Sequence, residues 1–371
     1  MQQELTPTLP QTNVQALPIT PAQPWLAPLA GHTDLAFRVL CREHGAAVAC
    51  TEMISAKGLV YGQRSRKASS GTKDLLLTTP LDNFPAAAQA DSPLVAQIFG
   101  EDPAFLAEAT QLLCDWGFKY FDLNMGCSVP KVVKTGAGSA LSRYTSTALK
   151  AAEAILKVAP TGCTGFKFRL GWCSEEENYL ELGQALANAG AAWLTLHPRY
   201  ARQGFSGIAN WQALANLKKC VNIPVIASGD LFTAEDAARC LRQTQVDAVM
   251  FARGAMQNPA VFEEYCLLLE QGLEKKPELA LNMRAQKAKS MILRHAELAR
   301  AMPGEAARQQ KHPGKPPMSL MKMRGAIPRY VKELPGSRFF RQELTQCTSW
   351  QDFYNLVENY FTEINKAADK Q

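Results

Sequence analysis

The chain has 371 residues, of which 47% are hydrophobic and 20% are charged, the balance of an ordinary globular protein. This length suits one α/β barrel of roughly 250 residues with a smaller appendage. No run of about 18 apolar residues is present, so we expect no membrane span. Residues 1–23 are rich in Pro, Gln and Thr and lack both the basic start and the continuous apolar run of a secretory signal, which predicts a flexible tail.

The cysteines of the chain are scattered rather than paired. None of the ten forms a C-x-x-C pair, and the five histidines do not cluster with them. Disulfide frameworks and zinc sites both depend on close, paired spacing. We therefore expect reduced thiols, no metal site and a cytoplasmic protein.

Positive charge is concentrated near the C-terminus. The net charge is +6, but residues 284–341 contain 14 Lys+Arg against 3 Asp+Glu, which is +11 and leaves −5 for the rest of the chain. A basic block on a mildly acidic body predicts a polyanionic partner for that block. A solvated helical face is the alternative, and composition alone does not separate the two.

Eight short β-branched or aromatic runs recur along the chain, with Ala- and Leu-rich helical stretches between them. This rhythm predicts parallel βα units and an α/β fold in which a (β/α)8 TIM barrel fills residues 25 to about 262. A doubly wound sheet would have fewer strands and usually an early G-x-G-x-x-G turn, which is missing from this sequence. The runs are Trp25–Ala27, Val48–Met53, Leu94–Phe99, Tyr120–Asn124, Gly165–Leu170, Trp193–His197, Pro224–Ser228 and Ala248–Arg253.

The strand signals stop after Phe262. Beyond that point the sequence predicts helices with breaks near Pro303-Gly304, 313–317 and Pro335-Gly336, because Pro and Gly end helices. We therefore expect three parts: a tail over residues 1–23, a barrel over residues 24–270, and a smaller all-helical domain over residues 280–371 that carries the basic block.

Catalytic groups of a barrel lie at the C-terminal ends of its strands and in the loops that follow. Small residues after the last two strands are where barrels commonly hold a phosphate. Lys167 and His197 on neighbouring strands are placed to meet a flat, electron-accepting ring, and a cation there would stabilise negative charge on a reduced flavin. The candidates in strand order are Pro28, Leu29 and Ala30; Glu52; Gln97; Asn124 and Cys127; Lys167 and Arg169; His197 and Arg199; Ser228, Gly229 and Asp230; and Ala252, Arg253 and Gly254.

Each candidate also has a structural interpretation. A Gly-Asp turn is a common loop, and a single cysteine among ten usually fills a core. Lys167 is a stronger signal because a buried lysine is costly unless it is paired or used. Cys127 is distinguished by its place after Asn124 and Gly126, before a Gly-, Lys- and Val-rich segment over residues 128–139 with no helix or strand pattern. Long irregular loops in barrels are usually functional.

Taken together, these residues resemble the tRNA-dihydrouridine synthases, and in particular their bacterial branches. The resemblance runs in order over roughly residues 24–362, and no single motif carries it. The matching segments are 27–34 with Phe37-Arg38, 51–53, 122–127 with 136–141, 167–171, 197–199, 203–207, 223–230, 253–255, and 323–330 with 334–336.

The resemblance implies an enzyme that uses FMN and NADPH to reduce the C5=C6 bond of specific D-loop uridines in tRNA. Hydride adds to C6, and Cys127 would protonate C5, since a free thiol with a pKa of about 8.5 is mostly protonated near neutral pH. The uridine must leave its stack to react. Asn124, Lys167 and Arg169 would bind the uracil, and Arg324 and Arg329 the tRNA phosphates. FMN would be held by Pro28, Leu29, Ala30, Gln97, Lys167, His197, Ser228, Gly229, Asp230, Ala252, Arg253 and Gly254.

Five positions depart from the family pattern, and two of them, Leu29 and Ala30, alter the first cofactor turn. Ser128 stands where Pro usually follows the cysteine, and Ser228 stands where Asn usually precedes Gly-Asp. Pro198 replaces a Gly, which fixes φ and removes an N–H. None of the five removes a residue that the reaction needs.

Two other functions fit the same residues. One is a dihydroorotate dehydrogenase-like flavin barrel acting on a free pyrimidine, against which the basic helical block argues. The other is a non-catalytic RNA-binding barrel, which would be colourless when purified. The sequence leaves open the uridine position and the choice between NADPH and NADH, and for the oligomeric state a monomer is favoured.

Overall fold

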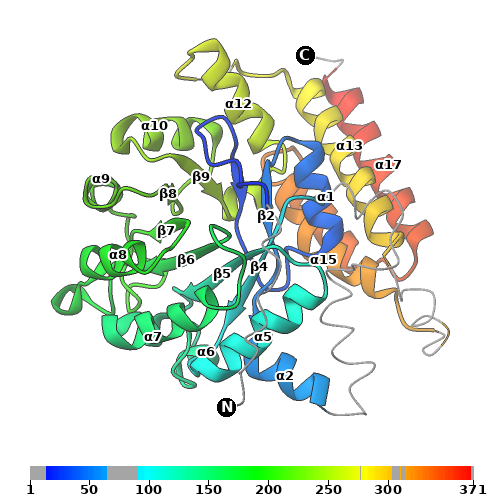
Figure 1. Ribbon diagram of the computed structural model, residues 1–371. Helices are drawn as coiled ribbons and strands as arrows, with labels where there is room; N and C mark the ends of the chain where they lie inside the picture. The colour runs from blue at the N-terminus through cyan, green and yellow to red at the C-terminus, as the bar shows by residue number, and fades with distance from the viewer. Residues whose placement is uncertain (1–13, 65–90, 276, 303–309, 311–313, 369–371) are drawn as a thin grey trace, which may run out of the picture.

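The computed structural model describes residues 14–64, 91–275, 277–302, 310 and 314–368. Within these ranges nine strands form one parallel sheet, and β9 pairs back with β1, which closes an eight-stranded barrel (Figure 1). The strands are β1 (Trp25–Leu26), β2 (Val48–Cys50), β3 (Ile54–Ser55), β4 (Leu94–Phe99), β5 (Tyr120–Met125), β6 (Thr164–Arg169), β7 (Trp193–His197), β8 (Val225–Ala227) and β9 (Ala248–Phe251).

The predicted TIM barrel is therefore confirmed, and each predicted run contains or overlaps one observed strand. One detail differs. The second run, Val48–Met53, is a strand only as far as Cys50, and the short strand β3 follows just beyond it. β2 and β3 pair separately with β4, through Cys50 with Val95 and Ile54 with Ile98.

Alternation along each strand separates the barrel interior from the helix-covered exterior, as in β5. Phe121, Leu123 and Met125 belong to the core between strands and helices, whereas Tyr120 belongs to the core inside the barrel. A strand places successive side chains on opposite faces, so Asp122 and Asn124 also point inward. Polar residues at alternate positions of a fully buried strand thus mark the interior.

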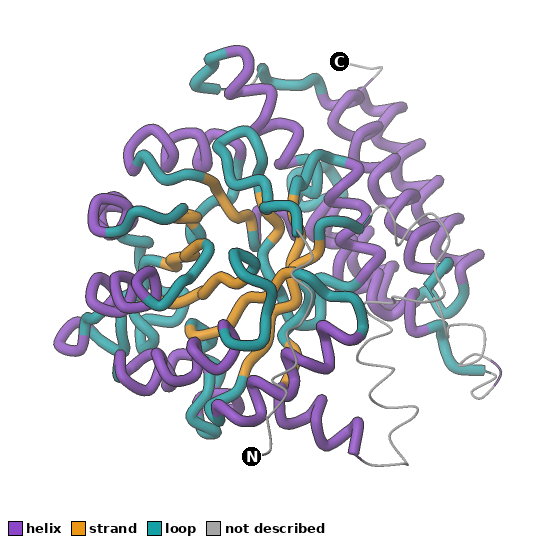
Figure 2. The backbone as a smooth tube through the Cα atoms, in the orientation of Figure 1, coloured by secondary structure: helices purple, strands orange, loops and turns teal. Residues whose placement is uncertain are grey.

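Helices surround the barrel as an outer ring (Figure 2). Local sequence explains where they begin. Thr233 and Asp236 form a capping box at the start of α10, and Asp102 with Pro103 begins α5. The ring and its connections contain α1 (Leu35–Glu43), α2 (Ala56–Arg64), α5 (Pro103–Asp115), α6 (Pro130–Val133), η1 (Gly138–Arg143), α7 (Thr145–Leu156), η2 (Ser174–Glu176), α8 (Tyr179–Asn188), α9 (Trp211–Cys220), α10 (Ala234–Thr244), α11 (Arg253–Gln257) and α12 (Val261–Gln271).

The C-terminal region is helical, as predicted, and lies against one side of the barrel (Figure 1). Its helices are α13 (Leu281–Arg300), α15 (Met318–Tyr330), α16 (Ser337–Gln346) and α17 (Trp350–Ala368). Its hydrophobic core includes Leu35 and Leu40 of α1 together with Ile292, Leu320 and Phe353. The helical region is therefore built onto a barrel helix. Of the predicted breaks, Pro335-Gly336 separates α15 from α16, whereas the break at Pro303-Gly304 lies outside the described residues.

The N-terminal segment closes the lower end of the barrel, opposite the strand C-termini. Val14, Leu17 and Ile19 pack against the interior core. The Tyr120 hydroxyl donates to the Gln15 carbonyl at 2.5 Å, and Trp25 Nε1 donates to the Pro18 carbonyl at 3.1 Å. A flexible tail over residues 1–23 is thus wrong for residues 14–23. The remaining part of that prediction, residues 1–13, lies outside the described residues.

Candidate active site

The upper half of the barrel interior, at the C-terminal ends of the strands, is polar. Its side chains come from neighbouring strands in register, since Gln97 pairs with Asp122, Asn124 with Lys167, and Arg169 with His197. All are buried or nearly so. A buried polar layer at the active end of a barrel is costly for folding, so these side chains identify the region where function is concentrated.

Four residues form a directed hydrogen-bond chain toward Cys127. Gln97 Nε2 donates to Asp122 Oδ1 at 2.7 Å, and Asn124 Nδ2 donates to Gln97 Oε1 at 2.9 Å. Asn124 Oδ1 then accepts from the backbone N–H of Cys127 at 2.9 Å and from that of Gly126 at 3.2 Å. The predicted Gln97, Asn124 and Cys127 are therefore brought together, and Asp122 joins them.

The backbone around Cys127 is held from two sides. Arg169 Nε donates to the Gly126 carbonyl at 2.8 Å, and the N–H of Ser139 donates to the Cys127 carbonyl at 2.9 Å. Gly138 has φ +62°, and a Cβ at that position would lie 2.5 Å from the Cys127 oxygen, so only glycine fits there. The segment over residues 128–139, expected to be irregular, contains the single helical turn α6 and leads into η1.

Lys167 lies in the centre of this polar layer. Its side chain has no hydrogen bond or ion pair within the described ranges, and Asp122 is the main negative charge acting on it. Burial lowers the pKa of Lys167 and raises the pKa of Asp122, because both charged forms lose solvation. A buried cation without a direct partner is unfavourable unless something else binds it. Lys167 therefore points to an anionic or carbonyl-bearing ligand.

Arg169 is tied to the loops around the mouth. Besides the Gly126 carbonyl, its guanidinium donates to the carbonyls of Tyr200 at 3.0 Å and Gly204 at 2.8 Å. Burial, followed by the charge of Arg199, lowers the pKa of Arg169 to about 10, so it stays protonated at neutral pH. Arg169 thus braces the Cys127 loop and brings positive charge to it.

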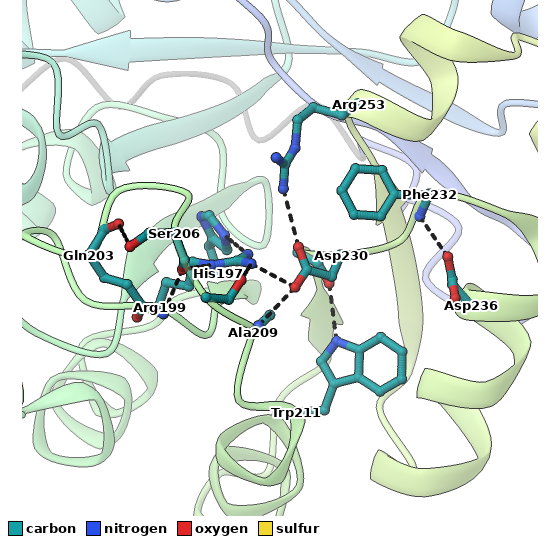
Figure 3. Close-up of polar contacts among 12 residues, drawn as sticks. His197, Arg199, Gln203, Ser206, Ala209, Trp211, Asp230, Phe232, Asp236 and Arg253 are labelled. Carbon is teal, nitrogen blue, oxygen red and sulfur yellow. Dashed lines mark hydrogen bonds and ion pairs between the residues drawn. The ribbon is translucent and has the colours of Figure 1, made fainter. Parts of the chain in front are cut away.

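A second cluster, shown in Figure 3, surrounds Asp230 in the loop after β8. Asp230 accepts from Arg199 at 2.7 Å, from Arg253 at 3.2 Å and from the N–H of Ala209 at 2.8 Å. Burial alone would raise the pKa of Asp230, but these hydrogen bonds and charges lower it. Its carboxylate therefore orients two arginines, and the cluster keeps a net positive charge.

Gly229 and His197 pack directly on each other beside this cluster. A Cβ on Gly229, whose φ is +128°, would lie 2.7 Å from His197 Cδ2 and 3.3 Å from Pro198 Cδ. Trp211 Nε1 donates to the Gly229 carbonyl at 3.1 Å (Figure 3). Burial and then the charges of Arg169, Lys167, Arg199 and Arg253 lower the pKa of His197, so its imidazole is neutral at pH 7 and able to accept or donate one hydrogen bond.

The other predicted cofactor residues lie around the rim. Ser228 is buried, and its N–H donates to the Leu196 carbonyl at 3.1 Å. A Cβ on Gly254 would lie 2.5 Å from the Leu231 carbonyl, which requires glycine after Ala252 and Arg253. Pro28 and Leu29 are half-buried and Ala30 is exposed.

Sequence reasoning missed Asp122 as a site residue. Attention to strand ends selects Asn124, whereas Asp122 lies two residues earlier in the same strand. A charged residue inside a strand that is buried on both faces was the signal that could have identified it.

The structure divides the basic block into two faces. Four of the five cations of α13 are paired with carboxylates from α1, α12, the α15–α16 turn and α17, whereas Arg300 donates to the Tyr354 hydroxyl. The pairs are Arg294 with Glu43, Lys287 with Glu263 and Glu264, Arg284 with Glu333, and Lys289 with Glu358. On α15, α16 and the turn between them, four cations besides Arg324 have no ion pair with any carboxylate that the structure describes. These cations, here called the α15–α16 face, are Arg329, Lys332, Arg338 and Arg341.

The two predicted tRNA-binding arginines differ in their surroundings. Arg324 is half-buried and donates to the Cys347 carbonyl, which ties α15 to the turn before α17. Arg329 lines a small cavity with His32 and Asp34 of the β1–α1 loop, next to Lys322. Lys322 itself pairs with Asp34 at 2.8 Å. Arg329 therefore lies where the helical region meets the rim of the barrel mouth.

In the described part of the chain, no three His, Cys, Asp or Glu side chains lie close enough together to hold a metal ion. All ten cysteines are free thiols. No described helix combines the length and the apolar character that crossing a membrane requires.

The sequence of this chain matches known proteins over most of its length. Residues 25–366 match the family described as dihydrouridine synthase (Dus). The probable tRNA-dihydrouridine synthase 1 of Synechocystis sp. is 32% identical over 90% of this chain and 84% of that protein, and the tRNA-dihydrouridine synthase B of Pseudomonas aeruginosa is 31% identical over 91% and 95%. An old yellow enzyme homologue from Zymomonas mobilis aligns with a TM-score of 0.48 and 13% identity over 69% of this chain and 91% of that chain. The chain belongs to the dihydrouridine synthase family of enzymes.

Proposed function

We propose that this enzyme reduces the C5=C6 bond of D-loop uridines in tRNA, with FMN as hydride carrier, NADPH as reductant and Cys127 as the acid that protonates C5. Family membership and the names of the relatives support the reaction. The observation that carries the site assignment is the unpaired, half-buried Lys167 near the loop that holds a free thiol at Cys127.

The residues at the mouth fit a flat, phosphorylated cofactor. Lys167 would face the electron-rich edge of the ring, and His197 would contact it beside Gly229, where any side chain would collide with the imidazole. Arg199 and Arg253, held by Asp230, supply the positive charge that a phosphate needs. When bound, FMN would supply the hydride that adds to C6. The other proposed contacts are Pro28, Leu29, Ala30, Gln97, Ser228, Ala252 and Gly254.

The uracil would lie against the Cys127 loop. The thiol would deliver its proton to C5, and Arg169, which already braces Gly126, would place positive charge beside a uracil carbonyl. Asn124 Nδ2 lies 3.0 Å from Met53 Sδ, a weak acceptor. Exchange of that sulfur contact for a uracil carbonyl would let Asn124 bind substrate without releasing Gln97 or Cys127.

The tRNA would bind along the α15–α16 face. Arg329, Lys332, Arg338 and Arg341 have no carboxylate partner within the described ranges, and Phe339 between two of them is 67% exposed, as a base-stacking residue would be. Because Arg329 adjoins the β1–α1 loop, this face leads to the mouth of the barrel. Arg324, half-buried on Cys347, would contribute mainly by long-range charge.

A matched pair of double variants tests this surface. Lys332→Gln with Arg338→Gln removes two unpaired cations, whereas Arg284→Gln with Lys289→Gln removes the same charge from cations that carboxylates already neutralise. We expect the first pair to weaken tRNA binding. The slope of the logarithm of the binding constant against the logarithm of the salt concentration should fall in magnitude by about 0.7–0.9 per lost phosphate contact. Equal losses for both pairs would mean that only net charge matters and would contradict the assigned face.

The activity itself is tested by incubating the purified, yellow protein and NADPH with unmodified tRNA or with free orotate. We expect dihydrouridine to form in tRNA and orotate to remain unchanged. Turnover of orotate alone would support the dihydroorotate dehydrogenase-like alternative, and a colourless protein that binds tRNA would support the non-catalytic one.

A further inference from the structure

The hydrogen-bond chain from Asp122 to Cys127 has a direction, and Asp122 determines it. Burial raises the pKa of Asp122, and the charge of Lys167 opposes that rise. In its ionised form the carboxylate can only accept hydrogen bonds, so Gln97 must turn its NH2 group toward Asp122 and its carbonyl toward Asn124. Asn124 must then donate to Gln97 and direct its own carbonyl to the N–H groups of Gly126 and Cys127. Each amide orientation follows from the one before it.

From this geometry we infer that Asp122 is a positioning residue for Cys127 that acts by setting the polarity of two intervening amides. This inference rests on the proposed function only in giving Cys127 its role as acid. Gln97 is 0% exposed, Asp122 2% and Asn124 8%. Water therefore cannot easily replace a hydrogen bond in which donor and acceptor are reversed.

Neighbouring groups keep the chain from reorganising elsewhere. The N–H of Gln97 donates to Thr51 Oγ1 at 3.0 Å, and Thr51 in turn donates to the Glu52 carbonyl at 2.7 Å. This anchors the backbone of Gln97, so its amide can only rotate in place. If the hydrogen bond between Asp122 and Gln97 is reversed, the Gln97 amide therefore rotates and the Asn124 amide must rotate in turn.

The substitution Asp122→Asn reverses the direction at its source. The introduced amide has both a carbonyl and an NH2 group, and the nearby positive charge of Lys167 attracts the carbonyl. The NH2 group then faces Gln97, which must rotate to accept, and Asn124 must rotate in turn. Its NH2 group would finally meet the N–H groups of Gly126 and Cys127, so donor faces donor and the loop is released.

A second substitution restores the direction without restoring Asp122. In Asp122→Asn with Gln97→Glu, the carboxylate moves one position along the chain. It accepts from Asn124 and from the amide introduced at position 122, so the Asn124 carbonyl again faces Cys127. The double variant has the same charge and nearly the same volume as the original pair. If these side chains mattered only for packing, the second substitution would add to the harm of the first and would not reverse it.

The experiment measures the rate at which iodoacetamide alkylates Cys127 in the purified flavoprotein, followed by mass spectrometry of its peptide. Cys50, which is 1% exposed inside the same barrel, reports general unfolding in each sample. Thr195→Val is the control variant, because Thr195 is buried next to Lys167 in the same layer but makes no hydrogen bond to the chain. Steady-state assays with tRNA separate kcat from KM.

We expect Asp122→Asn to raise the Cys127 alkylation rate about tenfold, the effect of losing one or two modest hydrogen bonds, while Cys50 stays unreactive. The kcat for uridine reduction should fall with little change in the KM for tRNA. The double variant should return both quantities to within about twofold of the original enzyme, and Thr195→Val should leave the alkylation rate unchanged.

Two results would overturn the inference: an unchanged Cys127 rate in Asp122→Asn, or a double variant as reactive as the single one. The alkylation rate does not depend on turnover. The variants could show the expected Cys127 alkylation rates even if the protein reduces no uridine in tRNA. That outcome would refute the proposed function and leave the positioning role of Asp122 intact.

Discussion

The two ends of the barrel interior are built from the same strands but differ in what they contain. The lower end holds Trp25, Tyr120, Trp193 and Met250 in a close-packed core that the N-terminal segment covers. The upper end replaces such residues with amides, a lysine, arginines and a histidine. The lower end therefore stabilises the barrel. The upper end holds charged and polar groups where water is scarce, and the stability of the lower end offsets the cost of burying them.

This contrast predicts opposite consequences for substitutions at the two ends. At the upper end, a change should alter chemistry and leave the free energy of unfolding nearly unchanged or even increased. At the lower end, a change should reduce that free energy and leave the chemistry of the folded molecules intact.

The largest effect is expected at the upper end, for Cys127→Ala. Removal of the proton donor should lower kcat by about 10²–10⁴-fold, the usual contribution of a general acid, because no other thiol is held by the Asn124 loop. Flavin content and melting temperature should stay close to those of the original enzyme, since Cys127 is only partly buried. Uridine reduction assays and thermal unfolding check both parts, and unimpaired turnover would remove Cys127 from the mechanism.

Trp193→Ala tests the lower end. The Trp193 ring is 1% exposed, contacts Trp25 edge-on at 5.5 Å, and occupies the space above Gly165. Its truncation should cost about 3–5 kcal/mol of unfolding free energy, measured by denaturant unfolding, whereas Trp193→Phe should cost less. The kcat per flavin-bound molecule should change less than about twofold. A large fall in kcat would mean that the two ends are not separable.

His295 lies at the junction between the rim and the helical region, and we expect it to make the free energy of unfolding depend on pH. Burial lowers the pKa of His295 to about 4, while Asp34 partly offsets this and Lys322 adds to it. An unfolded histidine has a pKa of about 6.5. Between these values the unfolded chain binds more protons, so stability should fall as the pH drops from about 6.5 toward 4.

The comparison variant for this prediction is His295→Gln, which cannot titrate but can still accept from Tyr330, whose hydroxyl lies 3.0 Å from His295 Nδ1. Between pH 7 and 4.5, the original protein should lose about 2–3 kcal/mol more unfolding free energy than the variant. Parallel pH profiles would show that His295 is not neutral in the folded state.

The smallest effect is expected for Thr195→Val in the upper layer. Thr195 is fully buried, and its hydroxyl has no hydrogen-bond partner among the described residues. Replacing it with an apolar group of the same shape should raise the unfolding free energy of the flavin-free protein by about 1 kcal/mol. Destabilisation by a similar amount would instead indicate that the hydroxyl is satisfied and that this layer does not oppose folding.

Sequence periodicity was sufficient to predict the barrel, because strand and helix patterns are local. The residues of the matching segments carried the family resemblance, which the comparisons confirm. The sequence alone did not identify Asp122, because its role depends on Gln97 of β4, which pairs with it in register. The pairing of Arg294 with Glu43, 251 residues away in the chain, could not be predicted either. A count of basic residues therefore overstated the unpaired positive charge, because carboxylates neutralise four cations of α13.

The most direct test of the central claim follows the proton that reaches C5. The enzyme, NADPH and unmodified tRNA are incubated in D2O, where the Cys127 thiol exchanges its hydrogen for deuterium, and the modified nucleoside is analysed by mass spectrometry and NMR. We predict deuterium at C5, with product formation lost in Cys127→Ala; the label at C6 is not diagnostic, because the N5–H of a reduced flavin exchanges with solvent. Product without deuterium at C5, or normal product formation by Cys127→Ala, would contradict the account.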